Sequence, residues 1–172
     1  MKKLVHGSCA DQNVDVVVNA ANGGLWAGGG ICGVIFSKAG MRELTEACGK
    51  YHTPLEDGSA VITPSFNMKN CKAIIHAVGP NFGVTPTAFD ALYNAYYNSM
   101  KVMMENDYHS ISFPLISSGI FGGNLDNPVG ESTKQFCKAY EKFVEDYPSY
   151  NIEVLLCAFG EGEYLRAREE YK

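Results

Sequence analysis

The chain has 172 residues, 46 % of them hydrophobic and 19 % charged, so it can bury a core and lacks the composition of a disordered protein. A formal net charge of −5 argues against a nucleic acid partner, and no apolar run approaches the roughly 20 residues that span a bilayer. Met1 is followed by two lysines but not by the apolar segment of a secretory signal. We therefore expect a cytoplasmic monomer with one domain over residues 1–172 and no membrane partner.

Six cysteines are scattered along the chain without a C-x-x-C pair or a zinc-finger spacing. This spacing favours free thiols in a reducing compartment. Cys157, inside the apolar run Val154–Ala158, is expected to act as a small hydrophobic side chain. The sequence predicts neither a metal site nor a bound cofactor.

Short apolar segments rich in β-branched residues alternate with helical patterns, which predicts an α/β fold with a sheet covered by helices on both faces. The predicted strands are Lys3–Val5, Asp15–Val18, Ala60–Thr63, Ala73–Val78, Ser110–Leu115 and Glu153–Ala158. The predicted helices begin near Gly30, at the Thr85-Pro86 step, before the apolar stripe of Phe136–Tyr147, and near Tyr164. Consecutive apolar residues in the second, fourth and sixth strands are typical of strands buried on both faces.

A glycine-rich loop follows the second predicted strand and leads into a helix. It reads Asn19-Ala20-Ala21-Asn22-Gly23-Gly24-Leu25-Trp26-Ala27-Gly28-Gly29-Gly30. Glycines before a helix allow close backbone approach, and their N–H groups form an anion site together with the helix N-terminus. Several charge-assisted hydrogen bonds of roughly 1.5–3 kcal/mol each hold a diphosphate without a basic side chain.

The fifth predicted strand ends in a second loop of small residues, Ser117-Ser118-Gly119-Ile120-Phe121-Gly122-Gly123. Ligands of such sheets bind outside the carboxyl ends of the strands, so we expect both loops to face one ligand. The pattern Gly28-x-Gly30-x-x-Gly33 also matches a dinucleotide-binding fingerprint, but it does not directly follow its strand. A nucleotide-dependent oxidoreductase is therefore only a remote alternative.

Three segments at matching spacing resemble the macro domain family. They are Val18–Asn22 with Ala27–Ile31, then Ile75–Phe82, then Phe113–Gly122. The resemblance covers nearly the whole chain and implies a three-layer α/β/α sandwich with a mixed, mostly parallel sheet that binds ADP-ribose. Many members of the family cleave ADP-ribose from modified proteins or deacetylate O-acetyl-ADP-ribose, and others only bind it.

The resemblance also implies roles for individual residues. Asn22 is expected to bond the distal ribose, with the Phe121 ring against the same sugar. Phe159 is expected to pack on the adenine, or else to be an ordinary core residue at a strand end. Asn19 is expected to cap its strand rather than to touch the ligand. The remaining contacts are expected from Gly28, Gly29, Gly30, Ile31, Cys32, Ser118, Gly119, Ile120 and Gly122.

Two residues depart from the family pattern. Ser8 stands where the family usually has an aspartate that accepts a hydrogen bond from the adenine amine, so selection of adenine is expected to be weak. Cys32 stands where many hydrolases of the family carry an aspartate, and a thiol is a poor mimic of a carboxylate base. Asp126 is another candidate base, and its alternative role is to cap the helix after Pro128. His76 is expected to be a satisfied core residue.

These residues favour an ADP-ribosyl hydrolase that acts on mono-ADP-ribosylated proteins, with Asn22 and Asp126 as the catalytic residues. In this mechanism the loops position a water beside the distal ribose, and a phosphate or Asp126 takes its proton. The alternatives are a reader module that binds ADP-ribose without cleavage and an O-acetyl-ADP-ribose deacetylase.

Overall fold

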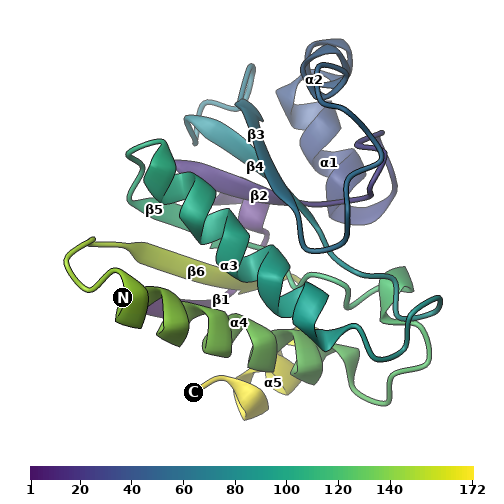
Figure 1. The fold of residues 1–172 in the computed structure, drawn as a ribbon, viewed down its shortest axis with the longest axis vertical. Coiled ribbons are helices and arrows are strands. Elements are labelled where there is room, and N and C mark those ends of the chain that lie inside the picture. The colour runs from purple at the N-terminus through teal and green to yellow at the C-terminus, as the bar shows by residue number, and fades with distance from the viewer.

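The computed structural model describes residues 1–172 and places one six-stranded sheet between two layers of helices (Figure 1). The strands are β1 (Lys2–His6), β2 (Val16–Ala21), β3 (Ala60–Pro64), β4 (Ala73–Val78), β5 (Ser110–Phe113) and β6 (Glu153–Ala158). The helices are α1 (Gly30–Ala39), α2 (Met41–Cys48), α3 (Phe89–Glu105), α4 (Pro128–Asp146) and α5 (Glu161–Glu170). Two short 3-10 turns are η1 (Cys9–Asp11) and η2 (Ile120–Gly122).

The strand order in the sheet is β1-β6-β5-β2-β4-β3. All neighbouring pairs are parallel except β3 with β4, which are antiparallel. The predicted three-layer sandwich with a mixed, mostly parallel sheet is therefore confirmed. None of the helices has the length and apolar character needed to cross a membrane.

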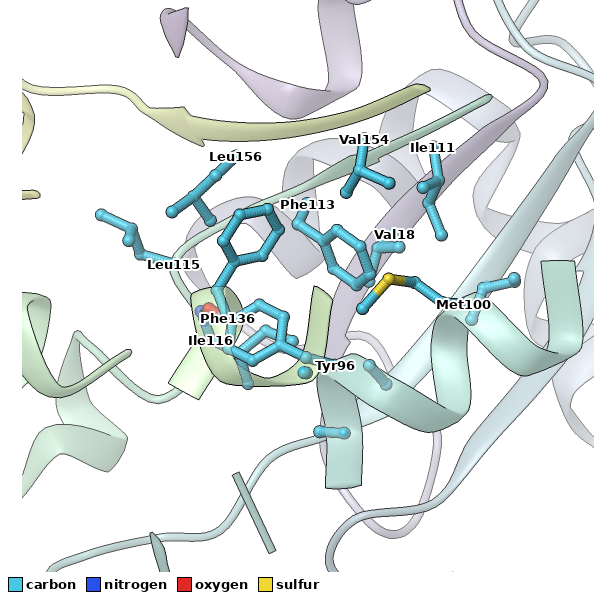
Figure 2. Close-up of a cluster of buried hydrophobic side chains, with 14 of the residues drawn as sticks. Val18, Tyr96, Met100, Ile111, Phe113, Leu115, Ile116, Phe136, Val154 and Leu156 are labelled. Atoms are coloured by element: carbon cyan, nitrogen blue, oxygen red, sulfur yellow. Dashed lines mark hydrogen bonds between the residues drawn. The ribbon is translucent and has the colours of Figure 1, made fainter. Parts of the chain in front are cut away.

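Each face of the sheet has its own apolar core, because successive strand residues point to opposite faces. Val16 and Val18 belong to the core beneath α3, α4 and α5, whereas Val17 packs with α1 and α2. In the larger core the rings of Tyr96 and Phe113 meet edge to face at a centroid distance of 5.2 Å (Figure 2). Burial on both faces explains the consecutive apolar residues of the central strands. All six cysteines are free, as the sequence predicts, and all six are also buried.

Several predicted boundaries are wrong, and α2 was not predicted. The Thr85-Pro86 step does not begin α3, because the Ala88 N–H bonds the Thr85 carbonyl in a turn and the helix starts at Phe89. β2 extends beyond Val18, β5 ends before Leu115, and α5 begins before Tyr164. The sequence did not predict α2 because this helix has only 8 residues and is separated from α1 by Gly40 alone.

Candidate ligand-binding site

The loops that carry the predicted site residues follow the carboxyl ends of the parallel strands. Those after β2, β4 and β5 gather on the right of Figure 1. In the sheet β2 lies between β4 and β5, so the two glycine-rich loops start from adjacent strands. The structure therefore brings both loops to one edge of the sheet, where ligands of such folds bind.

Asn22 begins the first loop and holds it closed. Its Nδ2 donates to the Trp26 carbonyl at 2.8 Å, and its Oδ1 accepts from the Trp26 N–H at 3.2 Å. Within this closed turn Leu25 is buried with a φ of 57°, a conformation that strains a residue other than glycine. Asn22 is therefore a clamp for the loop, and its contact with a ribose stays a prediction.

Helix α1 begins without a side-chain cap. Gly29 is its N-cap residue, and Gly30 has a φ of +58°, which glycine adopts without strain. A Cβ added at Gly29 or Gly30 would meet no atom within 4 Å, so the space in front of the helix is open. Uncapped N–H groups that face open space have the geometry of an anion site, where the helix dipole contributes roughly 0.3–1 kcal/mol.

Gly28 lies close against the first turns of α1. Its N–H donates to Cys32 Sγ at 3.4 Å. A Cβ on Gly33 would lie 2.8 Å from the Gly28 carbonyl oxygen, so glycine is what lets α1 approach the loop this closely. The glycine pattern that resembles a dinucleotide fingerprint is thus a packing requirement here, and the Asn22–Ala27 segment separates it from β2.

The buried Cys32 sulfur joins the first loop to the sheet. Besides the Gly28 N–H it accepts from Asn19 Nδ2 at 3.6 Å, and its thiol donates to the Trp26 carbonyl at 3.8 Å. Cys32 therefore has a hydrogen-bonding role beneath the glycine loop in addition to packing. Its predicted contact with a ligand stays a prediction.

Asn19 and His76 form a buried polar pair on adjacent strands. Asn19 Nδ2 lies 3.0 Å from His76 Nδ1, and His76 Nε2 lies 3.0 Å from Thr63 Oγ1. Because the amide nitrogen is a donor, Nδ1 accepts and Nε2 carries the proton. Burial lowers the pKa of His76 to about 4, so the ring is neutral near pH 7. The prediction of a core histidine is confirmed.

The predicted role of Asn19 as a strand-end cap is wrong. The residue lies inside β2, in register with His76, and it is fully buried. Its Oδ1 has no hydrogen-bond partner in the protein. Asn19 therefore connects His76 to Cys32, and through the sulfur to the glycine loop.

Ile116, at the start of the second loop, is bound through both of its backbone groups. Its N–H donates to the Tyr96 hydroxyl at 3.0 Å, and its carbonyl accepts from Ser132 Oγ at 2.6 Å. Since the Ser132 proton is used there, the Tyr96 hydroxyl donates to Ser132 Oγ, 2.6 Å away. This closed ring of hydrogen bonds fixes the loop to α3 and α4 (Figure 2 shows the Tyr96 ring in the core).

The second loop also locks onto the loop after β4. The Phe82 N–H donates to the Phe121 carbonyl at 2.7 Å. Gly123 has a φ of +55°, and a Cβ there would overlap the Gly83 nitrogen. Gly79 allows a similarly close approach, because a Cβ on it would overlap Ser117 Oγ. The two loops therefore form one rigid wall of the site.

The predicted ligand residues of the second loop differ in exposure. Ser118 Oγ donates to the Leu115 carbonyl at 2.7 Å. Gly122 is buried, and a Cβ added to it would lie only 2.8 Å from the Pro128 side chain. Gly119, in contrast, has no atom within 4 Å of a Cβ position, and Ile120 is 94 % exposed. The Gly119–Ile120 step thus faces open space, as the corresponding step at α1 does.

Two residues predicted to contact the adenine lie at the ends of β1 and β6. Phe159 is 75 % exposed, which excludes the alternative of an ordinary core residue. Ser8 is the N-cap of η1, and its Oγ accepts from the Ala10 N–H at 3.2 Å. The serine hydroxyl therefore already has a structural partner, and its contact with a base stays a prediction.

Asp126 is exposed and does not cap α4. That role belongs to Asn127, whose Oδ1 accepts from the Gly130 N–H at 3.0 Å, with Pro128 in the first turn. The capping alternative for Asp126 is therefore wrong, because the residue lies one position too early. Its catalytic role stays a prediction.

The loops of this edge contain no lysine or arginine in residues 19–30, 79–89 or 114–127. A negatively charged ligand would therefore be held by backbone N–H groups and not by basic side chains. Two cavities, of about 290 and 340 Å³, lie elsewhere and contain none of the predicted site residues. The first is lined by polar residues such as Asp15, Asn70 and Lys72 at the amino ends of the central strands.

Sequence reasoning missed the residues that support the loops from behind. Tyr96 and Ser132 were indistinguishable from core positions of amphipathic helices, because their partners are backbone groups far along the chain. The polar Asn19, next to three consecutive valines, was the one available signal of a buried polar contact.

Fold and candidate site together define an α/β protein with uncapped backbone N–H groups that face open space at the carboxyl edge of a mixed sheet. The sequence profile of the macro domain family matches residues 18–129. An O-acetyl-ADP-ribose deacetylase of Escherichia fergusonii is 43 % identical over 129 residues, which are 71 % of this chain and 72 % of the relative. The chain therefore belongs to the macro domain family.

Solved structures agree with this assignment. The Oceanobacillus iheyensis macrodomain with ADP superposes with a TM-score of 0.87 at 31 % identity, over 98 % of this chain and 88 % of the other. The Trypanosoma brucei macrodomain in complex with ADP-ribose gives a TM-score of 0.84 at 27 % identity, over 98 % and 68 % of the two chains.

Proposed function

We propose that this protein binds ADP-ribose at the carboxyl edge of its sheet and hydrolyses the bond that joins the distal ribose to a modified protein side chain. The observation that carries the proposal is the pair of open glycine steps, Gly29-Gly30 at the uncapped start of α1 and Gly119-Ile120 in the second loop. Ligands seen in the solved macrodomains, ADP and ADP-ribose, support the choice of nucleotide.

Each part of the ligand has a chemically suitable partner. The diphosphate oxygens accept hydrogen bonds from backbone N–H groups of both glycine steps, and each of these hydrogen bonds contributes roughly 1.5–3 kcal/mol. The exposed Phe159 ring packs on the adenine, and Asn22 with Phe121 flanks the distal ribose. The rigid wall of the second loop fixes the sugar and phosphate relative to each other, which is what positioning catalysis requires.

In the proposed reaction a water oxygen bonds to C1″ of the distal ribose, and the bond from C1″ to the modified side chain breaks. The side chain leaves with the bonding electron pair, and the water proton passes to a phosphate oxygen or to Asp126. Cys32 Sγ is already occupied by two N–H donors, so the proposal gives it no proton-transfer role.

A second candidate reaction is hydrolysis of the acetyl ester of O-acetyl-ADP-ribose, favoured by the name of the Escherichia fergusonii relative. Both reactions use the same bound nucleotide and a positioned water. They differ in the bond that breaks and in the substrate that is turned over.

Two measurements test the proposal. Free ADP-ribose should raise the melting temperature, since a ligand at 100 times its Kd stabilises the native state by about 2.7 kcal/mol, whereas NADH should do so much less. Release of ADP-ribose should then be followed with Asp/Glu-, Ser- and Arg-linked protein substrates and with O-acetyl-ADP-ribose. Binding without release from any of them would make the protein a reader, and equal shifts with NADH would refute the ADP-ribose site itself.

A further inference from the structure

Three exposed apolar side chains lie on loops at the carboxyl edge of the sheet, where the ribose site is proposed, and we call them the apolar rim: Trp26, Val84 and Ile120. They are 63 %, 78 % and 94 % exposed. They come from the loops after β2, β4 and β5, which are adjacent strands. Large apolar side chains exposed together beside a ligand site mark an interaction surface.

The rim has fixed backbone supports. The loops of Val84 and Ile120 are joined by the hydrogen bond from the Phe82 N–H to the Phe121 carbonyl. The Trp26 ring lies over Gly24, where a Cβ would come within 2.6 Å of the ring atom Cδ1. The loop backbones that carry the rim are therefore held by contacts within the protein.

The charge around the rim is acidic. Asp126 is the only charged residue in residues 19–30, 79–89 and 114–127. Glu56 and Asp57 are exposed and directly follow Leu55. The Leu55 N–H donates to the Gly23 carbonyl at 2.8 Å, so this acidic segment lies next to the first loop. A partner that fits this surface combines apolar residues with positive charge.

We propose that the apolar rim and these acids bind the polypeptide that carries the ADP-ribose, through an apolar residue and a lysine or arginine beside the modified position. The inference rests on the proposed function, in which the modified side chain leaves the distal ribose between Asn22 and Phe121. Asn22 is hydrogen-bonded to the Trp26 backbone, and Phe121 directly follows Ile120 in the chain. A basic segment also offsets the diphosphate charge that free ADP-ribose brings to an acidic edge.

The test uses peptides that carry ADP-ribose through a linkage that is not hydrolysed, flanked by Leu and Lys, by Leu and Glu, or by Gly and Ser. Dissociation constants are compared with that of free ADP-ribose. The Lys peptide should bind about tenfold more tightly than the Glu peptide at 50 mM salt, and the ratio should shrink to about threefold or less at 0.5 M salt.

Variants assign the effect to the surface. Glu56→Lys with Asp57→Lys should remove the preference for the Lys peptide, whereas Glu169→Lys on the far end of α5 should not. Val84→Ser should weaken binding of the Leu-containing peptides about threefold and leave free ADP-ribose unchanged. Val144→Ser, on an exposed position of α4, is the matched control.

The outcomes separate the two proposals. Equal affinities for all three peptides, or tighter binding of the Glu peptide, overturn the inference while the affinity for free ADP-ribose remains. Failure of free ADP-ribose to bind overturns the proposed function, and the inference with it. A Lys preference that survives reversal of Glu56 and Asp57 also overturns the inference.

Discussion

His76 should make the free energy of unfolding depend steeply on pH in the mildly acidic range. Its pKa is lowered by burial from 6.5 to about 4, so the folded protein binds fewer protons than the unfolded chain between these values. The contribution of His76 to the free energy of unfolding is therefore fully present above pH 6.5 and is lost as the pH is lowered towards 4. Each pH unit costs about 1.4 kcal/mol, which gives about 3.4 kcal/mol over the whole window.

Urea unfolding at half-unit steps from pH 5 to pH 8 measures this slope, above the range in which most carboxylates titrate. His76→Gln should be less stable at pH 8 but should show a nearly flat profile between pH 5 and 6.5. His52→Gln, at an exposed position, should keep the wild-type slope. A wild-type profile as flat as that of His76→Gln would refute the assignment of a neutral, buried ring to His76.

Four substitutions test the site. Asn22→Ala should lower turnover about 100-fold or more, because it frees the first loop and removes the proposed contact with the ribose. Gly33→Ala should lower ADP-ribose affinity about tenfold, since its Cβ displaces Gly28, although alanine favours the helix by about 1 kcal/mol. Cys32→Ala should lower the affinity for ADP-ribose about two- to fivefold, because it removes the hydrogen bond that the Gly28 N–H donates to the sulfur. Gly123→Ala should destabilise the fold by about 2 kcal/mol or more.

Calorimetry, turnover assays and urea unfolding on each variant distinguish these expectations. The Asn22 prediction fails if turnover falls no more than the population of folded protein does. Unchanged affinity in the Gly33 or Cys32 variant would mean that the position of Gly28 does not control the ligand. Wild-type stability of the Gly123 variant would contradict the contact between the two loops.

The layered fold and the location of the candidate site could be predicted because both depend on local patterns. Short apolar segments predicted all six strands, and the glycine-rich loops predicted to face one ligand do lie at one edge of the sheet, after β2 and β5. The first residues of the helices were harder to predict from the sequence. The first turn of α3 has no side-chain cap, so the Thr85-Pro86 signal a few residues earlier predicts the wrong start.

Contacts between distant segments could not be predicted from one sequence. The cap of α4 differs from the expected one by a single position, and an aspartate followed by an asparagine offers no local reason to prefer either. Asn19 and Cys32 were each interpreted alone, whereas their roles arise from the distance between them across the strand and the helix. The same holds for Tyr96, whose hydroxyl group meets a backbone N–H 20 positions away.

The ring of hydrogen bonds around Ile116 has a consequence for protein engineering. The second loop depends on the two helices behind it, because Tyr96 and Ser132 satisfy the backbone of Ile116 in the core. Grafting the loop alone onto another sheet would leave a buried N–H and a buried carbonyl without partners. A graft that brings the tyrosine and the serine with it keeps partners for both backbone groups of Ile116, and one that also includes the loop after β4 keeps the Phe121 contact as well.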